Sequence, residues 1–579
     1  MIKVDKLSYS FPQKNLYNDI SFTLEEGQHC AFIGSNGTGK STLIDIIMDP
    51  EKYMYDGLLE ISPNCRIGYV RQFQEVDKTK DITVFEYLAE DFIKLQNEIA
   101  AICTEMETSS DIETLLEKYQ KALDAFEAIN GDDFENIIDK KLNLIELIKS
   151  KDLLISELSG GEFKLIQVIK SMLTTPDLLI MDEPDVFLDF KNLKALKDLI
   201  NSHKGTMLVI THNRYLLNHC FNKIIHLENM ELQEFDGGYV EYNFSLLQTK
   251  IELQELAAAD TEEIERNEIL IDRLRELASE NKEQFRGKTL RARVKFQERL
   301  EKRRIKAPFV DIKQPNIMFT TANEIEEKTA LKVTDYSVTF DDVLLENVSF
   351  EIKSTDKVAI VGANGTGKTT LFQEILKNNN PSIEIDSNLK VGYFSQLQGQ
   401  TLNYSNTILE EFFDIGFKTY DDIKSYLELY NFDEELLNQK IGTLSGGEKN
   451  ILQLAKISEV GADLLLLDEP TSHLDTYSQI ALEKAIKNYK GAILMISHDY
   501  YTISNCMDYV LLVEDKKIRK INIQHFRDMI YMNHFNKDYL KLEQKKKEVE
   551  TKIELALRDN NFILAKELSE QLEKIVTSL

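Results

Sequence analysis

Two stretches of the chain share one pattern, in which alternating hydrophobic and polar positions are followed by short apolar runs. The first stretch covers about Ile2–Tyr242 and the second about Leu331–Phe526. In each, an apolar run (HCAFI at 29–33, KVAIV at 357–361) leads into a glycine-rich loop and then a helix. Strands that alternate with helices predict an α/β domain with a mainly parallel sheet.

Between these stretches, leucines recur at helical spacing along a charged linker of about residues 243–328. They are Leu246, Leu253, Leu256, Leu270, Leu274 and Leu277, and no Gly or Pro interrupts residues 243–286. A second helix that packs antiparallel to the first is indicated by Leu290, Val294 and Leu300. A helix of roughly 37 residues spans about 55 Å, so we expect a protruding hairpin rather than a flexible tether.

The first stretch also carries an insertion. Gln72 and Gln396 are 324 residues apart, whereas the later motifs repeat at 286, so 38 extra residues lie between Gln72 and Ser159. Its helical, acidic sequence predicts an arm over about residues 88–135; a lengthened helical subdomain without function is the alternative. A charged helical extension, 527–579, follows the second stretch. A pair of helices is one interpretation, and a solvated tail is the default.

A set of nucleotide-binding motifs occurs twice in the same order. GSNGTGKS at 34–41 and GANGTGKT at 362–369 fit the P-loop pattern, and LSGGE follows at 158–162 and 444–448. An apolar run then ends in a carboxylate pair, at Asp182–Glu183 and Asp468–Glu469, and a histidine closes each set at 212 and 498. From the serine of LSGGE onward every pair is separated by 286 residues. Repetition of a whole ordered set excludes coincidence.

These residue types suit phosphate chemistry. Glycines let backbone N–H groups surround phosphate oxygens at a helix N-terminus, while Lys40 and Lys368 reach the β and γ phosphates and Ser41 and Thr369 offer hydroxyls to Mg²⁺. The full predicted nucleotide loops are Gly34, Asn36, Gly37, Gly39, Lys40, Ser41 and Thr42, with Gly362, Asn364, Gly365, Gly367, Lys368, Thr369 and Thr370.

The carboxylates and their neighbours suit the hydrolytic step. We expect Asp182 and Asp468 in the magnesium shell, and Glu183 and Glu469 to orient or deprotonate water. The remaining predicted catalytic residues are His212 and His498, near the γ-phosphate, and Gln72 and Gln396, near metal and water. ATP and Mg²⁺ are therefore the expected cofactors.

Composition fits a protein of the reducing cytoplasm. The five cysteines (Cys30, Cys65, Cys103, Cys220 and Cys506) include no CxxC pair, which disfavours a disulfide framework or zinc site. No apolar run approaches the ~18 to 20 residues that cross a bilayer.

Net charge is −29, which alone argues against nucleic acid, but its distribution is uneven. Residues 282–306 hold eleven Lys or Arg against three Glu. The predicted RNA contacts are Lys282, Arg286, Lys288, Arg291, Arg293 and Lys295. Solvation of a coiled coil is the alternative role for this charge.

LSGGE paired with a P-loop resembles the ATP-binding cassette superfamily. In that family the signature of one cassette covers the ATP held by the other. The resemblance implies that Ser445, Gly446 and Gly447 complete the site of Lys40, and that Ser159, Gly160 and Gly161 complete the site of Lys368. Phe11 and Phe340 stand where adenine-stacking aromatics would; a core aromatic on the first strand is an equally good interpretation of both.

Two fused cassettes with an arm and a basic helical linker resemble the ABC-F class of ribosome-associated ATPases. DEPTSHLD at 468–475 is close to that class's usual DEPTNHLD, and residues 287–303 look like its linker tip. The first cassette departs from the class, with Asp185, Val186 and Phe187 where Thr, Asn and His would stand, and Asn213 replaces the aspartate seen at Asp499. Asp182, Glu183 and Asp189 are retained, which keeps hydrolysis possible while symmetric coupling of the sites is in question.

The expected architecture is therefore α/β. It has a first cassette at 1–242, a hairpin linker at 243–328, a second cassette at 329–526 and the extension. The resemblance implies an ATPase that binds the ribosome as a monomer with paired cassettes, near the tRNA exit site. Its linker would point toward the peptidyl-transferase centre, contacting 23S rRNA, P-site tRNA and exit-site proteins.

Within the class, the divergent first cassette and long hairpin lean toward antibiotic protection of ribosomes over a housekeeping role. The alternatives are a double ATPase subunit of a membrane transporter and a DNA-repair or structural-maintenance ATPase. The latter type splits its cassettes with long coils, which this chain does not do.

Overall fold

The structure is a computed structural model that describes residues 1–11, 14–63, 65–72, 81–107, 111–256, 312–322, 326–339, 343–534 and 537–578. It forms two compact units. The first joins Met1–Asp236 to Lys313–Ile530 and holds both cassettes, and the second joins Gly237–Ile312 to Tyr531–Leu579. The predicted linker tip and all six predicted RNA contacts lie outside the described residues.

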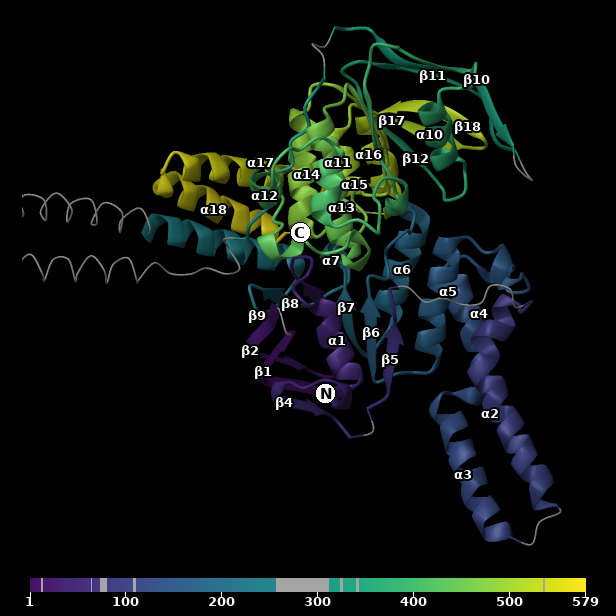
Figure 1. Ribbon diagram of the computed structural model, residues 1–579. Coiled ribbons are helices and arrows are strands. Elements are labelled where there is room, and N and C mark those ends of the chain that lie inside the picture. The colour runs from purple at the N-terminus through teal and green to yellow at the C-terminus, as the bar shows by residue number, and fades with distance from the viewer. Residues whose placement is uncertain are drawn as a thin grey trace, which may run out of the picture. The chain divides into compact units, whose positions relative to one another are not determined.

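A six-stranded sheet forms the centre of the first cassette, in the order β5-β6-β7-β3-β8-β9 (Figure 1). Neighbouring strands are parallel, except that β9 runs antiparallel to β8. The strands are β3 (His29–Ile33), β5 (Ile67–Val70), β6 (Leu178–Asp182), β7 (Thr206–Ile210), β8 (Lys223–Glu228) and β9 (Glu231–Asp236). All residues of β6 and β7 are buried, as continuous apolar runs of a covered parallel sheet require.

An antiparallel sheet of β2 (Lys14–Leu24), β1 (Ile2–Phe11) and β4 (Asp56–Ile61) completes the core of this cassette. Alternate residues of β1, such as Ile2 and Val4, pack with α1 (Lys40–Met48) and the main sheet in one hydrophobic cluster. The helix that follows the P-loop is therefore fixed between two sheets.

Further helices of the first cassette are α2 (Val84–Met106), α3 (Ile112–Ala128), α4 (Phe134–Leu144), α5 (Gly160–Leu173), α6 (Phe190–Ser202) and α7 (Arg214–His219). Thr83 begins α2 with a capping box to Glu86. Helices α2 and α3 lie side by side and extend away from the sheet (Figure 1), joined by a small cluster around Ile102, Leu115 and Ala122.

The second cassette repeats this topology, with sheets β14-β15-β16-β12-β17-β18 and β11-β10-β13. Its strands are β10 (Thr329–Thr339), β11 (Val343–Lys353), β12 (Lys357–Gly362), β13 (Ile383–Ile385), β14 (Val391–Phe394), β15 (Leu464–Asp468), β16 (Ala492–Ile496), β17 (Tyr509–Glu514) and β18 (Lys517–Asn522). Its helices are α10 (Lys368–Lys377), α11 (Ile408–Asp414), α12 (Tyr420–Glu428), α13 (Gly446–Val460), α14 (Thr476–Asn488), α15 (Tyr500–Cys506) and α16 (Ile523–His534). The predicted pair of tandem α/β cassettes is confirmed.

The C-terminal extension is a packed hairpin rather than a solvated tail. Helices α17 (Lys537–Arg558) and α18 (Phe562–Val576) bury Ile553, Leu568 and Leu572 against Ile251 of the helical segment 239–256. Although the extension is highly charged, its two helices share one apolar face, and the first residues of the linker pack against that face.

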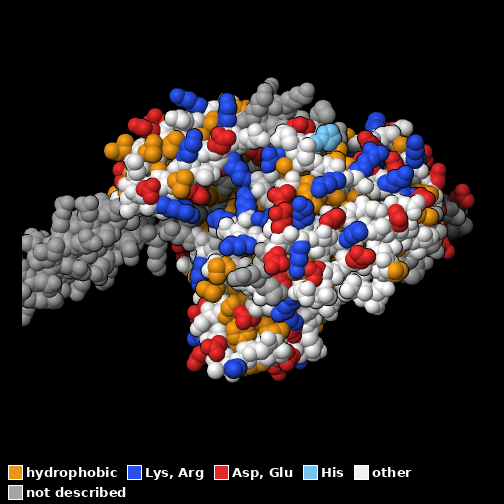
Figure 2. Space-filling model, turned by 90° about the horizontal axis from the view of Figure 1, so that it is seen from above, with side chains coloured by type: hydrophobic (Ala, Val, Ile, Leu, Met, Phe, Trp, Pro, Cys, Tyr) orange, Lys and Arg blue, Asp and Glu red, His pale blue; other side chains and the backbone are white. Residues whose placement is uncertain are grey.

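No helix within the described ranges is long and apolar enough to span a membrane. Figure 2 shows Lys and Arg side chains interspersed with Asp and Glu over the face in view, so the acidic excess does not collect there in a single patch.

Candidate functional site

The P-loops fold as closed turns at the start of α1 and α10. Gly39 and Gly367 have φ of 98° and 87°, a left-handed conformation that glycine adopts without strain. Lys40 Nζ donates to the carbonyls of Gly34 (2.9 Å) and Ser35 (2.8 Å). Lys368 Nζ donates likewise to Gly362 (2.8 Å) and Ala363 (2.7 Å). Both ammonium groups are thus held by backbone carbonyls of their own P-loops.

The carboxylate pairs stand at the carboxyl ends of β6 and β15, beside the P-loops. Glu183 N donates to Ile210 O and Glu469 N to Ile496 O, both at 2.9 Å, so the two cassettes hold their glutamates in the same frame. Each glutamate has a left-handed φ, 44° and 50°. Such backbone strain in a non-glycine residue persists only where the surroundings impose it.

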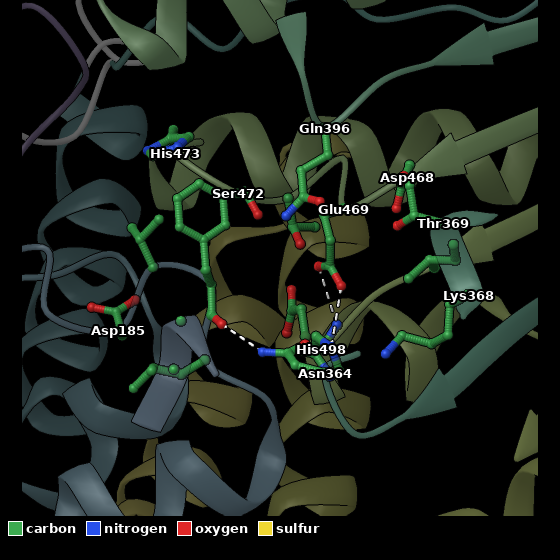
Figure 3. A pocket seen from close by; sticks show the side chains of 18 of the residues that line it. Asp185, Asn364, Lys368, Thr369, Gln396, Asp468, Glu469, Ser472, His473 and His498 are labelled. Atoms are coloured by element: carbon green, nitrogen blue, oxygen red, sulfur yellow. Dashed lines mark hydrogen bonds and ion pairs between the residues drawn. The ribbon is translucent and has the colours of Figure 1, made fainter. Parts of the chain in front are cut away.

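A cavity of about 480 Å³ lies between the cassettes, at the predicted second site. The second cassette contributes Gly365, Gly367, Lys368, Thr369, Thr370, Gln396, Asp468, Glu469 and His498 to its lining. The first contributes its signature glycines Gly160 and Gly161, and the cavity also reaches Glu183, Phe187 and His212 of that cassette. In Figure 3, Lys368, Thr369, Asp468 and Glu469 gather on one side of it, with Gln396 beside Glu469. Of the catalytic, magnesium-binding and signature residues predicted for this composite site, all but Ser159 therefore line the cavity.

At the predicted first site, the cassettes touch directly. Asn36 Nδ2 donates to His473 O at 2.8 Å. A Cβ added to the signature glycine Gly447 would lie 1.9 Å from Asn36 Nδ2 and 2.7 Å from His473 O. Only glycine permits so close an approach.

A loop between each glutamate and the following helix, here called the bridging loop (residues 184–189 and 470–475), makes the cross-cassette contacts. Asn36 N donates to Asp475 Oδ2 at 2.9 Å, and Asn364 N donates to Asp189 Oδ2 at 3.2 Å. Asn364 Nδ2 also donates to Phe187 O at 2.9 Å. The same bridge therefore occurs twice, once from each cassette.

The two aspartates also begin helices. Asp189 accepts from Asn192 N in α6 and Asp475 from Ser478 N in α14. One carboxylate oxygen caps a helix while the other holds the opposite P-loop, which ties the position of each P-loop to the other cassette.

A buried ion pair also joins the cassettes, and the position matched to its arginine in the second cassette is Tyr500. Arg214 Nη2 lies 2.5 Å from Glu483 Oε1 and 2.9 Å from Asp499 Oδ2, and its guanidinium stacks over Tyr501. All three charged side chains are at most 17% exposed. Asn213 still caps α7 as Asp499 caps α15, so replacement of the aspartate keeps the cap and loses only the charge.

The signature serines and the two predicted adenine-stacking aromatics complete the set of predicted site residues. Ser159 and Ser445 form capping boxes with Glu162 and Glu448 at the starts of α5 and α13. Phe11 is 46% exposed at the end of β1, with its ring edge-on to Tyr9; it is therefore not a core aromatic. Phe340 lies outside the described residues.

Comparison with known proteins identifies the family. The ABC transporter family profile matches residues 17–186 and 345–472, at least half of the chain. A Bacillus subtilis protein named uncharacterized ABC transporter ATP-binding protein YfmM is 30% identical, covering 86% of this chain and 96% of the relative. ABC transporter F family member 2 of Arabidopsis thaliana is 30% identical over 89% of this chain and 76% of its own. The chain belongs to the ABC-F branch of the ATP-binding cassette family.

A more distant sequence relative and a solved structure are consistent with this family assignment. The energy-dependent translational throttle protein EttA of Escherichia coli is 27% identical over 87% of this chain and 90% of its own. A structure of an archaeal ribosome recycling factor, aABCE1, superposes with a TM-score of 0.54 at 19% identity over 91% of this chain and 92% of its own; at that identity it shows the fold alone. As an ABC-F protein, the chain is an ATPase with two ATP-binding domains.

Buried polar atoms around the cavity fit a nucleotide and a cation. Both carboxylate oxygens of Asp468 and Nδ1 of His498 lack a hydrogen-bond partner among the described residues. Buried polar atoms in proteins are normally paired, so these atoms have the capacity to bind Mg²⁺ and phosphate. Burial raises the pKa of Asp182 and of Asp468 to about 6, and a bound cation would favour their ionised forms.

The two glutamates have different electrostatic surroundings. Burial acts to raise the pKa of Glu183, but the hydrogen bond with His473 and the nearby positive charge of Lys40 outweigh it, and the pKa is lowered. Burial dominates at Glu469 and, with the adjacent Asp468, raises its pKa to about 8. Burial also lowers the pKa of His212 to about 4 and of His498 to about 3, so both imidazoles are neutral near pH 7.

Motif matching did not find His473, Arg214 or Asp475 as participants. His473 and Phe187 are 286 residues apart and so occupy matched positions. The difference between Phe187 and His473 is therefore visible in the sequence. The sequence alone does not show which of these side chains contacts which glutamate.

Proposed function

We propose that this protein is a ribosome-binding ATPase whose two composite sites couple ATP binding to pairing of its cassettes. The observation that carries the proposal is the double bridge, in which each P-loop is held by an aspartate of the opposite cassette at 2.9 and 3.2 Å. Because each site needs residues of both cassettes, nucleotide bound in either one favours the paired state.

Within each site we assign roles by motif and position. Lys40 and Lys368 would hold phosphates, with Ser41, Gln72 and Asp182 or Thr369, Gln396 and Asp468 holding Mg²⁺. Bound Mg²⁺ would neutralise charge on the phosphates. Glu183 and Glu469 would accept a proton from the attacking water, and neutral His212 and His498 would orient the reacting groups.

Ribosome binding is supported by the similarity to EttA, whose name describes a translational throttle, over 87% of this chain. The basic segment 282–306 supplies the chemistry for ribosomal RNA or tRNA, because phosphate contacts by Lys and Arg position a protein without reading sequence. Six to ten such contacts would weaken binding by roughly 10³ to 10⁵ between about 50 and 200 mM salt.

We further propose that the linker enters the ribosome near the tRNA exit site and points toward the peptidyl-transferase centre. There it would displace a bound antibiotic, and hydrolysis would then release the protein. The divergent first bridging loop and the long linker support this protective role over a housekeeping one.

The test uses a Glu183→Gln, Glu469→Gln double variant, which lacks both proposed bases while keeping the shape of the sites. Loss of a general base lowers turnover by about 10² to 10⁴. We expect this variant to bind ATP and to accumulate on ribosomes in a sucrose gradient, with wild type and ADP as controls. Free protein under those conditions, or ATP-dependent recovery with membranes instead, would overturn the proposal and favour a transporter subunit.

A further inference from the structure

The two catalytic glutamates are held in matched backbone frames but contact different side chains. At the first site, Gln72 Nε2 donates to Glu183 Oε2, and His473 Nδ1 lies 3.3 Å from the same oxygen. Gln72 Nε2 and His473 Nδ1 are themselves 3.3 Å apart. The carboxylate is thus held by one residue of its own cassette and one of the other.

At the second site the corresponding support comes from within one cassette. His498 N donates to Glu469 Oε2 at 3.3 Å, and His498 Nε2 lies 3.5 Å from Glu469 Oε1. The first cassette presents Phe187 where the second presents His473, and a phenyl ring offers a carboxylate no N–H donor. Figure 3 shows Glu469 directed toward His498, with His473 well away from it.

The two bridging loops have similar backbones at this position, so loop shape does not explain why the two glutamates contact different side chains. Phe187 and His473 have φ of 65° and 59°, and the carbonyl of each accepts a hydrogen bond from the opposite P-loop asparagine. The two rings meet edge-on, with centroids 5.5 Å apart. Phe187 therefore packs against the imidazole that reaches Glu183, and the side chain is what differs between the sites.

We infer that His473 of the second cassette is a positioning residue for the first site. It aligns Glu183 only when the second bridging loop is docked on the first cassette. Glu469 receives no such contact from Phe187 and is aligned by its own cassette. The first site would therefore hydrolyse ATP only in the paired state, whereas alignment of the second base would not depend on the opposite bridging loop. This inference rests on the catalytic roles proposed for Glu183 and Glu469.

The size of the effect follows from positioning. A reacting group displaced by about 1 Å loses on the order of 10² in rate. His473→Phe, which copies the first cassette's own residue, should lower kcat at the first site by roughly 10- to 100-fold. The KM for ATP should change less than threefold, because His473 is assigned no contact with nucleotide.

Single-site backgrounds separate the two reactions. Glu469→Gln leaves the first site active, and Glu183→Gln leaves the second. We expect His473→Phe to lower kcat at least tenfold more in the Glu469→Gln background than in the Glu183→Gln background. His473→Gln, which restores an N–H donor, should recover part of the loss.

The reciprocal variant, Phe187→His, offers the second site an imidazole, and we expect kcat in the Glu183→Gln background to rise. Equal losses from His473→Phe in both backgrounds, a change confined to KM, or no recovery with His473→Gln would overturn the inference. If neither glutamine background lowers hydrolysis, the proposed catalytic roles themselves fail, and that result is distinguishable from the others.

Discussion

Removal of Arg214 tests how strongly the buried ion pair holds the cassettes together. Arg214→Met keeps the length of the stem but leaves Glu483 and Asp499 facing each other without a cation. Their side chains are 8% and 17% exposed. Breaking a buried ion pair by deleting one partner costs about 3 to 5 kcal/mol, because the remaining charge is left uncompensated. At about 1.4 kcal/mol per decade, the paired population should fall by roughly 10² to 10³ or more.

The assay is retention of labelled ATP by the Glu183→Gln, Glu469→Gln protein after a chase with unlabelled ATP. Because hydrolysis is blocked, release reports opening of the cassettes. We expect Arg214→Met to speed release by about two orders of magnitude, and Arg214→Lys, which keeps the charge, to have a smaller effect.

A compensated variant provides the matched control. Adding Glu483→Gln and Asp499→Asn to Arg214→Met removes the buried negative charges, and asparagine already caps the equivalent helix at Asn213. Retention should recover toward that of the parent. Release within threefold of the parent in Arg214→Met alone, or an equal loss of thermal stability with and without ATP, would show that the ion pair does not hold the cassettes together.

Three further outcomes are expected. Leu572→Ala should destabilise the helical unit by about 2 to 5 kcal/mol, because Leu572 is fully buried in the α17–α18 cluster; limited proteolysis should cut the extension sooner, and unchanged cleavage would argue against that packing. Because burial raises the pKa of Glu469 to about 8, its base form increases as pH rises through 8, so second-site ATPase in the Glu183→Gln background should rise between about pH 7 and 9; a flat profile would contradict this assignment. Charge reversal at Arg291 and Arg293 should weaken ribosome binding and flatten its salt dependence while ATPase persists; loss of ATPase would point to a role in folding instead.

The sequence predicted the parts of this molecule that are local or repeated. The offset of 286 residues paired the motifs correctly. The apolar runs before Gly34 and Gly362 predicted strands leading into the P-loops, and the structure has β3 and β12 there. The composite arrangement came from the family resemblance, and at the second site the structure brings the corresponding residues together except for Ser159.

Contacts between distant side chains were beyond the sequence. His473 and Glu183 are 290 residues apart, and only the docked bridging loops bring them within 3.3 Å. Arg214 has no counterpart in the repeat, since Tyr500 stands at the matched position, so no motif marks it. The extension was obscured for another reason: its charged residues dominate the composition, while one buried face determines its packing.

We propose that pairing of the cassettes by ATP directs the basic linker into the ribosome. The most direct measurement is an electron microscopy reconstruction of the ATP-bound double glutamine variant on ribosomes. We expect density for residues 282–295 within reach of the peptidyl-transferase centre, and no such particles without nucleotide. Equal decoration of ribosomes by nucleotide-free protein, or a linker directed into solvent, would contradict it.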